Sequence, residues 1–213
     1  VHPAVRSTVQ TYCDGVGVPV VEVPLQDGKT DAAALKALVG DTDACLVLQQ
    51  PNYYGNIEDA AALGEVVHAA GAKFVMSVNP IAAGLLCSAA ECGADIAVGE
   101  GQPLGMPLSF GGPYLGFMAC TAALTRRLPG RIVGETVDSR GGRCYVLTLQ
   151  AREQHIRREK ASSNICSNQA LCAMTATAYL AAVGQGGLKQ AAQLSAAKAH
   201  YLAQRLCELP GFS

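Results

Sequence analysis

The amino-acid sequence predicts an α/β fold built on a mostly parallel sheet that is flanked by helices. Two observations carry this prediction: five short apolar runs rich in β-forming residues, and a helical pattern between the second and third runs. Because neighbouring parallel strands need a crossover, and the crossover is usually a helix, this alternation favours a parallel sheet. The expected strands span residues 19–25, 43–50, 73–79, 95–100 and 114–120.

The helix between the second and third expected strands lies within residues 56–71. Asn56 can cap its start, Asp59 then occupies its third position, and Gly71 can close it. Apolar residues three and four positions apart fill the segment between them. The sequence therefore predicts a strand, helix, strand unit here.

Three further helices are expected in the last third of the chain. Residues 144–161 have the pattern of an amphipathic helix with paired charges four residues apart. Ser163 or Asn164 can cap the next helix, residues 168–184, whose small and apolar residues on nearly every side favour close packing. A last helix is expected over residues 187–209.

Composition limits the classes of function. The chain has 213 residues, half of them hydrophobic, which is enough for one large domain and a tail. It carries 16 Lys and Arg residues against 17 Asp and Glu residues, a formal net charge of -1. With its charges so nearly balanced, the chain has no overall positive electrostatic field that would attract nucleic acid or an acidic membrane surface. Neither is therefore expected as a partner.

The nine cysteines form no C-x-x-C pair and have no histidines in metal-ligand spacing. We expect buried thiols rather than a disulfide framework or a metal site, and a reducing, intracellular location, which is cytoplasmic if the source is bacterial. The sequence contains no run of eighteen apolar residues, which a membrane span would require. It also shows no basic and then apolar leader pattern before the first expected strand. Since the chain begins with Val1, we expect a fragment of a longer protein.

Ligands of parallel α/β sheets gather at the carboxyl ends of the strands, where three notable loops are expected. The first loop is PNYYG (51–55), the second is NPIAAG (79–84), and the third, within residues 98–119, is rich in glycine and proline. The third loop matches neither a phosphate loop nor a dinucleotide turn. Two interpretations stay open: a fixed backbone path that something approaches closely, or an ordered turn between two strands.

Four stretches give the chain a resemblance to a known family. They are residues 49–59 (QQPNYYGNIED), 93–119, 128–138 (LPGRIVGETVD) and 147–171. These stretches resemble the amino-terminal half, or separate alpha subunit, of the glycine cleavage system P-protein, the decarboxylating glycine dehydrogenase. The resemblance covers essentially the whole chain.

The resemblance implies the large domain of a fold type I pyridoxal-phosphate-dependent transferase, of the aspartate aminotransferase kind. Residues 1–184 would form part of that domain, and residues 185–213 a connecting helix toward a small carboxy-terminal domain that this chain lacks. The reaction implied is decarboxylation of glycine on pyridoxal phosphate, followed by transfer of the aminomethyl group to the lipoyl arm of H-protein.

That chemistry needs a lysine for the Schiff base and an acid against the pyridine nitrogen. In catalytic members of the family the lysine follows the strand that corresponds to residues 95–100. Here there is no lysine between Lys73 and Lys160, and Pro103 lies near the expected position. The acid should end the strand over residues 73–79, where the sequence reads Ser-Val-Asn. We therefore expect no catalytic residue and no cofactor-binding residue in this chain, and pyridoxal phosphate on the homologous half instead.

A few polar residues are candidates for lining a channel or a partner's site: Asn52, Tyr53, Glu100, Gln102 and Asn164. Each also has an ordinary structural interpretation. The first two belong to a turn with aromatic anchors, and Glu100 and Gln102 can bond the amides of their own loop.

The leading hypothesis is the non-cofactor-binding half of glycine dehydrogenase, itself inactive. Its expected partners are a homologous beta subunit or carboxy-terminal half, in a heterotetramer, and lipoyl H-protein. The helix over residues 168–184 offers an apolar dimer face. The alternative hypothesis is a structural or interaction protein that derives from a pyridoxal phosphate enzyme and has no catalytic partner.

Overall fold

A computed structural model describes residues 1–129, 132–149, 154–161 and 169–212. The chain divides into two compact units. The first unit comprises residues 1–119 and 170–213, and the second comprises residues 120–169.

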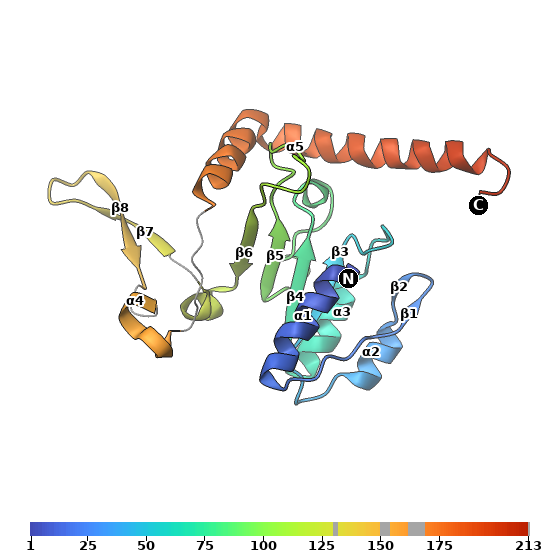
Figure 1. The fold of residues 1–213 in the computed structure, drawn as a ribbon, viewed down its shortest axis with the longest axis horizontal. Coiled ribbons are helices and arrows are strands. Elements are labelled where there is room, and N and C mark those ends of the chain that lie inside the picture. The colour runs from blue at the N-terminus through green and yellow to red at the C-terminus, as the bar shows by residue number, and fades with distance from the viewer. Residues whose placement is uncertain (130–131, 150–153, 162–168, 213) are drawn as a thin grey trace. The chain divides into compact units, whose positions relative to one another are not determined.

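The first unit is built on a four-stranded sheet in the order β3-β4-β5-β6 (Figure 1). Strands β3 (Cys45–Gln50), β4 (Lys73–Val78) and β5 (Ile96–Glu100) are parallel, in register from Cys45 opposite Lys73 and from Val75 opposite Ile96. Strand β6 (Gly116–Cys120) returns beside β5, and the Gly101 amide donates to the Leu115 carbonyl at 2.7 Å where the two strands meet. The predicted, mostly parallel α/β sheet is confirmed.

Helix α3 (Ala60–Ala69) connects β3 to β4 and supplies one side of the core. Leu63 and Val67 of α3 face Phe74 and Met76 of β4, and all four side chains are buried. Each such side chain contributes about 1.5–3 kcal/mol of transfer free energy to folding. Leu35 of the short helix α2 (Ala32–Leu38) completes this cluster.

Helix α3 begins three residues later than the sequence suggests. Asp59, not Asn56, is its N-cap, and the Asp59 carboxylate accepts from the Ala62 amide at 3.3 Å. The physical reason is Glu58, because its amide is bonded to the Gln50 side chain and residues 56–58 therefore stay outside the helix. Gly71 ends this turn in the left-handed region, as predicted.

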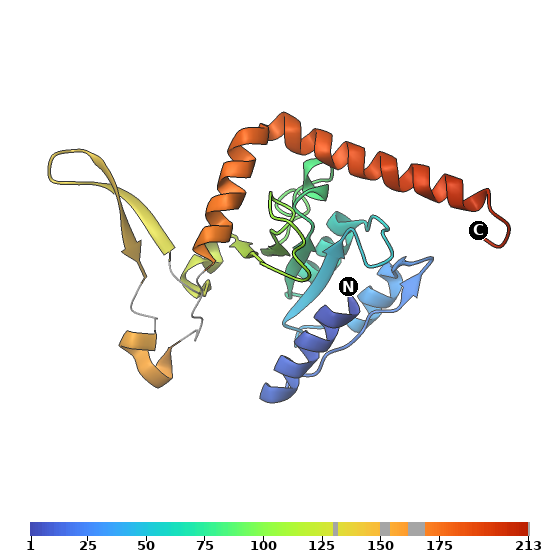
Figure 2. The ribbon, with the colours of Figure 1, turned by 45° about the horizontal axis from the view of Figure 1, so that its top comes forward.

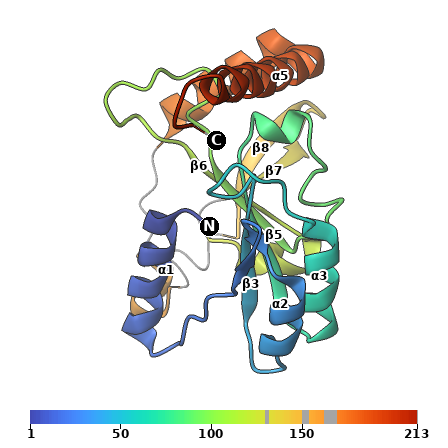
Figure 3. The ribbon, with the colours of Figure 1, turned by 90° about the vertical axis from the view of Figure 1, so that its right-hand side faces the viewer.

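The strand predicted over residues 19–25 is wrong. After α1 (Pro3–Val16), only Leu25 of this run lies in a strand, in the two-residue pair β1 (Leu25–Gln26) and β2 (Lys29–Thr30). A strand needs a ladder partner as well as apolar residues, and the apolar residues of this run are largely exposed. Figure 3 shows α1 and α2 beside the sheet.

Helix α5 (Ala170–Cys207) joins two of the expected helices into one element with a break at Gly184, as the bend in Figures 1 and 2 shows. It packs on the loops that follow the sheet strands: a side chain at Gly84, in η1 (Ala82–Gly84), would lie 3.2 Å from the Leu188 carbonyl oxygen. The expected division of the chain at residues 184 and 185 falls at this break and stays a prediction.

By length and composition alone, α5 is also long and apolar enough to cross a membrane. One such helix is weak evidence, since a long helix of a soluble protein passes the same test.

The second unit contains the hairpin of β7 (Ile132–Val137) and β8 (Arg143–Thr148), with η2 (Ala122–Arg127) before it and α4 (Gln154–Arg157) and η4 (Arg158–Lys160) after it. The amphipathic helix predicted over residues 144–161 is therefore wrong at its start, where residues 144–148 form a strand; residues 150–153 lie outside the described residues, and residues 154–160 are helical in α4 and η4. Residues 143–148 pair residue by residue with β7, and the Asp138 carboxylate closes the turn by accepting from the Gly142 amide at 2.8 Å. The backbone pairing with β7 decides the structure of these residues and outweighs the charge spacing.

Candidate functional site

The carboxyl ends of β3, β4 and β5 lie at one edge of the sheet, as predicted. The Asn79 amide donates to the Gln50 carbonyl at 3.2 Å, which joins the ends of the first two strands. The three loops that leave this edge contain most of the candidate residues.

Asn52, in the first loop, is buried and fully committed to the protein itself. Its Nδ2 donates to the Gly28 carbonyl and to Glu58 Oε1, each at 2.8 Å. Its Oδ1 accepts from the amides of Tyr54 at 2.9 Å and Asn56 at 3.1 Å. An amide side chain offers two donors and two acceptor positions, so Asn52 retains no capacity for a ligand.

Glu58 is a buried carboxylate that the sequence analysis missed. Its Oε2 accepts from the Thr30 amide at 3.0 Å, and its backbone exchanges two hydrogen bonds with the Gln50 side chain, at 3.0 and 3.1 Å. Buried polar groups are tolerated when they are bonded in this way. No local spacing predicts this network, because the residues that bond Glu58 lie six or more positions away in the chain.

Tyr53 presents half of its surface to solvent. Its ring makes edge contacts with His2 at a centroid distance of 5.2 Å and with Tyr54 at 5.4 Å. Tyr53 is therefore a half-exposed aromatic side chain within the first loop, and its expected role toward a partner stays a prediction.

At the end of β4, where the implied pyridine acid would stand, the side chains carry no charge. Asn79 Oδ1 accepts from the amides of Ile81 and Ala82, each at 3.0 Å, and so caps the turn that leads into η1. An asparagine that is used as a cap cannot hold a proton on a ring nitrogen.

Glu100 and Gln102 brace the third loop. Glu100 Oε1 accepts from the Gln102 amide at 2.9 Å and from the Leu115 amide at 2.7 Å, so that one oxygen holds both stems of the loop. Gln102 Nε2 donates to the carbonyls of Pro107 at 3.1 Å and Leu108 at 3.3 Å. Both side chains bond atoms of their own loop, which is the ordinary structural interpretation of these residues.

Pro103 is exposed in a turn whose Leu104 amide donates to the Gly101 carbonyl at 2.9 Å. Asn164 lies outside the described residues, and so do Ser163 and Cys166.

The residues at this edge do not fit pyridoxal phosphate. That cofactor is held by a lysine Schiff base and an acidic or basic partner of its ring nitrogen. None of the three loops contains a lysine, no acid ends β4, and the carboxylate that ends β5, Glu100, uses one oxygen to hold two backbone amides. Lys73 begins β4 at the opposite edge, and Lys160 is exposed in η4 of the second unit.

At the opposite edge, Asp95 gathers three partners. The Phe74 amide donates to Asp95 Oδ2 at 2.9 Å, His68 Nε2 lies 2.9 Å from the same oxygen, and Lys73 Nζ donates to Oδ1 at 3.0 Å. Burial alone would raise the pKa of Asp95, but these hydrogen bonds and the Lys73 charge lower that pKa to about 2. The cluster ties α3 to β4 and β5 and lies away from the candidate site.

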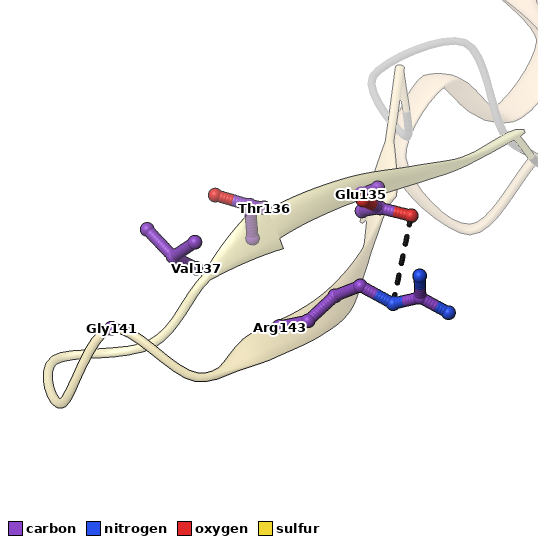
Figure 4. A pocket seen from close by; sticks show the side chains of 5 residues that line it. All are labelled: Glu135, Thr136, Val137, Gly141 and Arg143. Carbon is purple, nitrogen blue, oxygen red and sulfur yellow. Dashed lines mark ion pairs between the residues drawn. The ribbon is translucent and has the colours of Figure 1, made fainter.

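The second unit holds an open hollow along its hairpin, shown in Figure 4. It is lined by Glu135, Thr136, Val137, Gly141 and Arg143, and the Arg143 Nε lies 3.8 Å from Glu135 Oε2. All five residues are exposed, so the hollow cannot enclose a cofactor. Among the described residues, no group of three or more His, Cys, Asp or Glu side chains is placed to hold a metal ion.

Comparison with known proteins gives matches over nearly the whole chain. The family described as Glycine cleavage system P-protein matches residues 1–211. A protein of Moorella thermoacetica named "Probable glycine dehydrogenase (decarboxylating) subunit 1" is 57% identical over 211 residues, which are 99% of this chain and 48% of that protein. A crystal structure of glycine decarboxylase (P-protein) of the glycine cleavage system, in inhibitor-bound form, is 46% identical with a TM-score of 0.94, over 99% of this chain and 47% of that one.

A more distant solved structure agrees in fold alone. The apo structure of a cysteine desulfurase from Thermococcus onnurineus NA1 is 19% identical with a TM-score of 0.59, over 94% of this chain and 46% of that chain. The architecture is therefore that of fold type I pyridoxal-phosphate-dependent enzymes, as predicted. The chain spans about half the length of the curated relatives that it matches.

Proposed function

Because this chain belongs to the glycine cleavage system P-protein family, we propose that it is the non-cofactor-binding half of a glycine dehydrogenase (decarboxylating). The homologous half, as a separate subunit or a fused segment, would hold pyridoxal phosphate. The complete enzyme would decarboxylate glycine and pass the aminomethyl group to the lipoyl arm of H-protein.

One observation carries this proposal: the carboxyl edge of the sheet offers neither anchor that pyridoxal phosphate needs, because its three loops contain no lysine and β4 ends in Ser-Val-Asn where the acid would stand. Asn52 and Asn79 bond backbone amides, and Glu100 bonds both stems of its loop. No lysine lies in the three loops and no acid ends β4, so the edge is suited to support a neighbouring site and not to perform the chemistry itself.

Helix α5 supports a stable association with another subunit. Its first half exposes Leu171, Met174 and Leu180 among small residues. Exposed apolar side chains gathered on one element are typical of a surface that a permanent partner covers. The partner that the relatives' name implies is a second subunit, and we assign the cofactor to it.

The eight cysteines within the described residues are all free thiols, which supports the proposed reducing, intracellular location. The expectation of buried thiols holds for Cys92 and is wrong for Cys45, Cys87 and Cys207, which are exposed.

Reconstitution tests the proposal. The full-length subunit that contains this chain is purified alone and with its homologous half, and release of carbon dioxide from labelled glycine is measured with lipoyl H-protein present. We expect activity only from the pair, and the variants Lys73→Arg and Lys160→Arg should leave the activity of the pair within twofold of the wild type.

Activity of the subunit alone would contradict the assignment. If the pair associates without decarboxylating glycine, the alternative of an interaction protein without catalytic partner replaces it.

A further inference from the structure

The third loop of the candidate site begins a segment without charge. No Asp, Glu, Lys, Arg or His occurs from Gly101 to Thr125, whereas Asp, Glu, Lys and Arg make up 15% of the whole chain. Interfaces between permanently associated subunits are depleted of charge and enriched in aromatic residues and methionine. The composition of this segment therefore matches a buried surface better than a solvated one.

The loop nevertheless presents its apolar side chains outward in this chain. Leu108 is 80% exposed and Phe110 is fully exposed at the tip, and Tyr114 and Met118 are about half exposed. Single exposed apolar residues are ordinary, but an exposed leucine and an exposed phenylalanine two positions apart on an uncharged tip form an apolar knob that water solvates poorly.

Hydrogen bonds within the loop and a contact with α5 fix the conformation of the loop that carries this knob. Glu100 and Gln102 make the four bonds described above, which fix the stems of the loop and the carbonyls of Pro107 and Leu108. The base of the loop rests on α5 at Gly105, where a Cβ would lie 2.7 Å from the Cβ of Tyr179. Ser109 and Phe110 both have positive φ, of 42° and 55°. A loop that is ordered before binding loses less entropy on association.

We propose that the loop over residues 101–115 docks into the homologous half of the enzyme, with Leu108 and Phe110 as its anchors and with Glu100 and Gln102 as positioning residues. The inference rests on the proposed function, which supplies that partner. A permanent subunit fits this surface better than H-protein, because an exchanging carrier that must associate and leave quickly is usually steered by complementary charges.

The test measures the affinity between the full-length subunit and its separately purified homologous half by analytical ultracentrifugation. Phe110→Ala should raise the Kd at least tenfold, as truncation of a buried aromatic anchor commonly does. The matched control is Tyr12→Ala on α1, which removes an aromatic side chain that is 76% exposed and should change the Kd by less than twofold. Because Phe110 is fully exposed, the melting temperature of the free subunit should stay unchanged.

A second pair of variants separates positioning from folding. Glu100→Ala removes the oxygen that holds both stems and should weaken association as Phe110→Ala does. Glu100→Gln retains a side-chain carbonyl oxygen for the same two amides and should restore most of the affinity.

Two results have different meanings. If the wild-type subunit and its homologous half neither associate nor decarboxylate glycine, the proposed function fails. If they associate and decarboxylate glycine but the double variant Leu108→Ala, Phe110→Ala binds within twofold of the wild type, only the docking inference is overturned. A variant that binds its homologous half normally but raises the KM for H-protein would also overturn it, in favour of carrier docking.

Discussion

Asp95 offers a prediction whose magnitude follows from the structure. Its carboxylate is partly buried, with 12% of the side chain exposed, and it is bonded to the Phe74 amide, His68 and Lys73. Its pKa is lowered from an ordinary value of 3.8 to about 2. Each unit of pKa difference between the unfolded and the folded protein corresponds to about 1.4 kcal/mol, so the lowered pKa of Asp95 adds about 2.5 kcal/mol to the free energy of unfolding.

We therefore expect Asp95→Asn to lower the free energy of unfolding by about 2–3 kcal/mol at pH 7, measured by urea denaturation of the full-length subunit. Glu65→Gln is the control, since it removes an exposed carboxylate from the same helix as His68 and should cost less than about 0.5 kcal/mol.

The pH dependence has a definite sign. A carboxyl group whose pKa is lowered on folding stabilises the protein above its unfolded pKa and loses that contribution as the pH falls toward its folded pKa. The difference between wild type and Asp95→Asn should thus be complete above about pH 5 and shrink as the pH falls through 3.8 toward 2. A variant within 0.5 kcal/mol of the wild type at pH 7 would refute the role assigned to this cluster.

Three further variants test the packing and polar networks of the first unit. Glu58→Ala should cost about 2–4 kcal/mol in urea denaturation, because it leaves the buried Asn52 amide and the Thr30 amide without their acceptor; unchanged stability would mean that water replaces the carboxylate. Phe74→Ala should lower the free energy of unfolding by about 3–5 kcal/mol, as truncation of a fully buried aromatic ring does, and a thermal melt checks it. Asp31→Ala removes the N-cap of α2, a carboxylate that accepts from two backbone amides. It should lower the free energy of unfolding by about 1 kcal/mol in the same thermal melt, and a loss below about 0.3 kcal/mol would count against this capping role.

The sequence predicted the central sheet because its signals there are local. The runs that become β3, β4 and β5 are apolar, and the helical pattern between the first two of them ends at Gly71. Parallel pairing then follows from connectivity alone. The edge at which the loops meet was predicted for the same reason.

Where the prediction was wrong, partners distant in the chain decided the structure. Residues 19–24 have strand composition but no ladder partner, and the start of α3 is displaced by the bond between Glu58 and Gln50. The first part of the helix expected over residues 144–161 gives way to β8, because β7 pairs with residues 143–148 across the turn at Asp138. Such outcomes depend on contacts that a local pattern does not contain.

The candidate site divides in the same way. The missing lysine is a property of the sequence and needed no structure. The roles of Asn52, Glu100 and Gln102 did need it, because whether an amide or a carboxylate is free for a partner depends on which backbone groups surround it. Their proposed contribution to a shared enzyme stays a prediction.

The most direct test of the central claim locates pyridoxal phosphate in the assembled enzyme. The full-length subunit and its homologous half are mixed with the cofactor, reduced with borohydride, and digested, and the labelled lysine is identified by mass spectrometry. The account predicts label on the homologous half and none on this chain. Stoichiometric label on a lysine of this chain, at Lys160 or Lys189 for example, would contradict it.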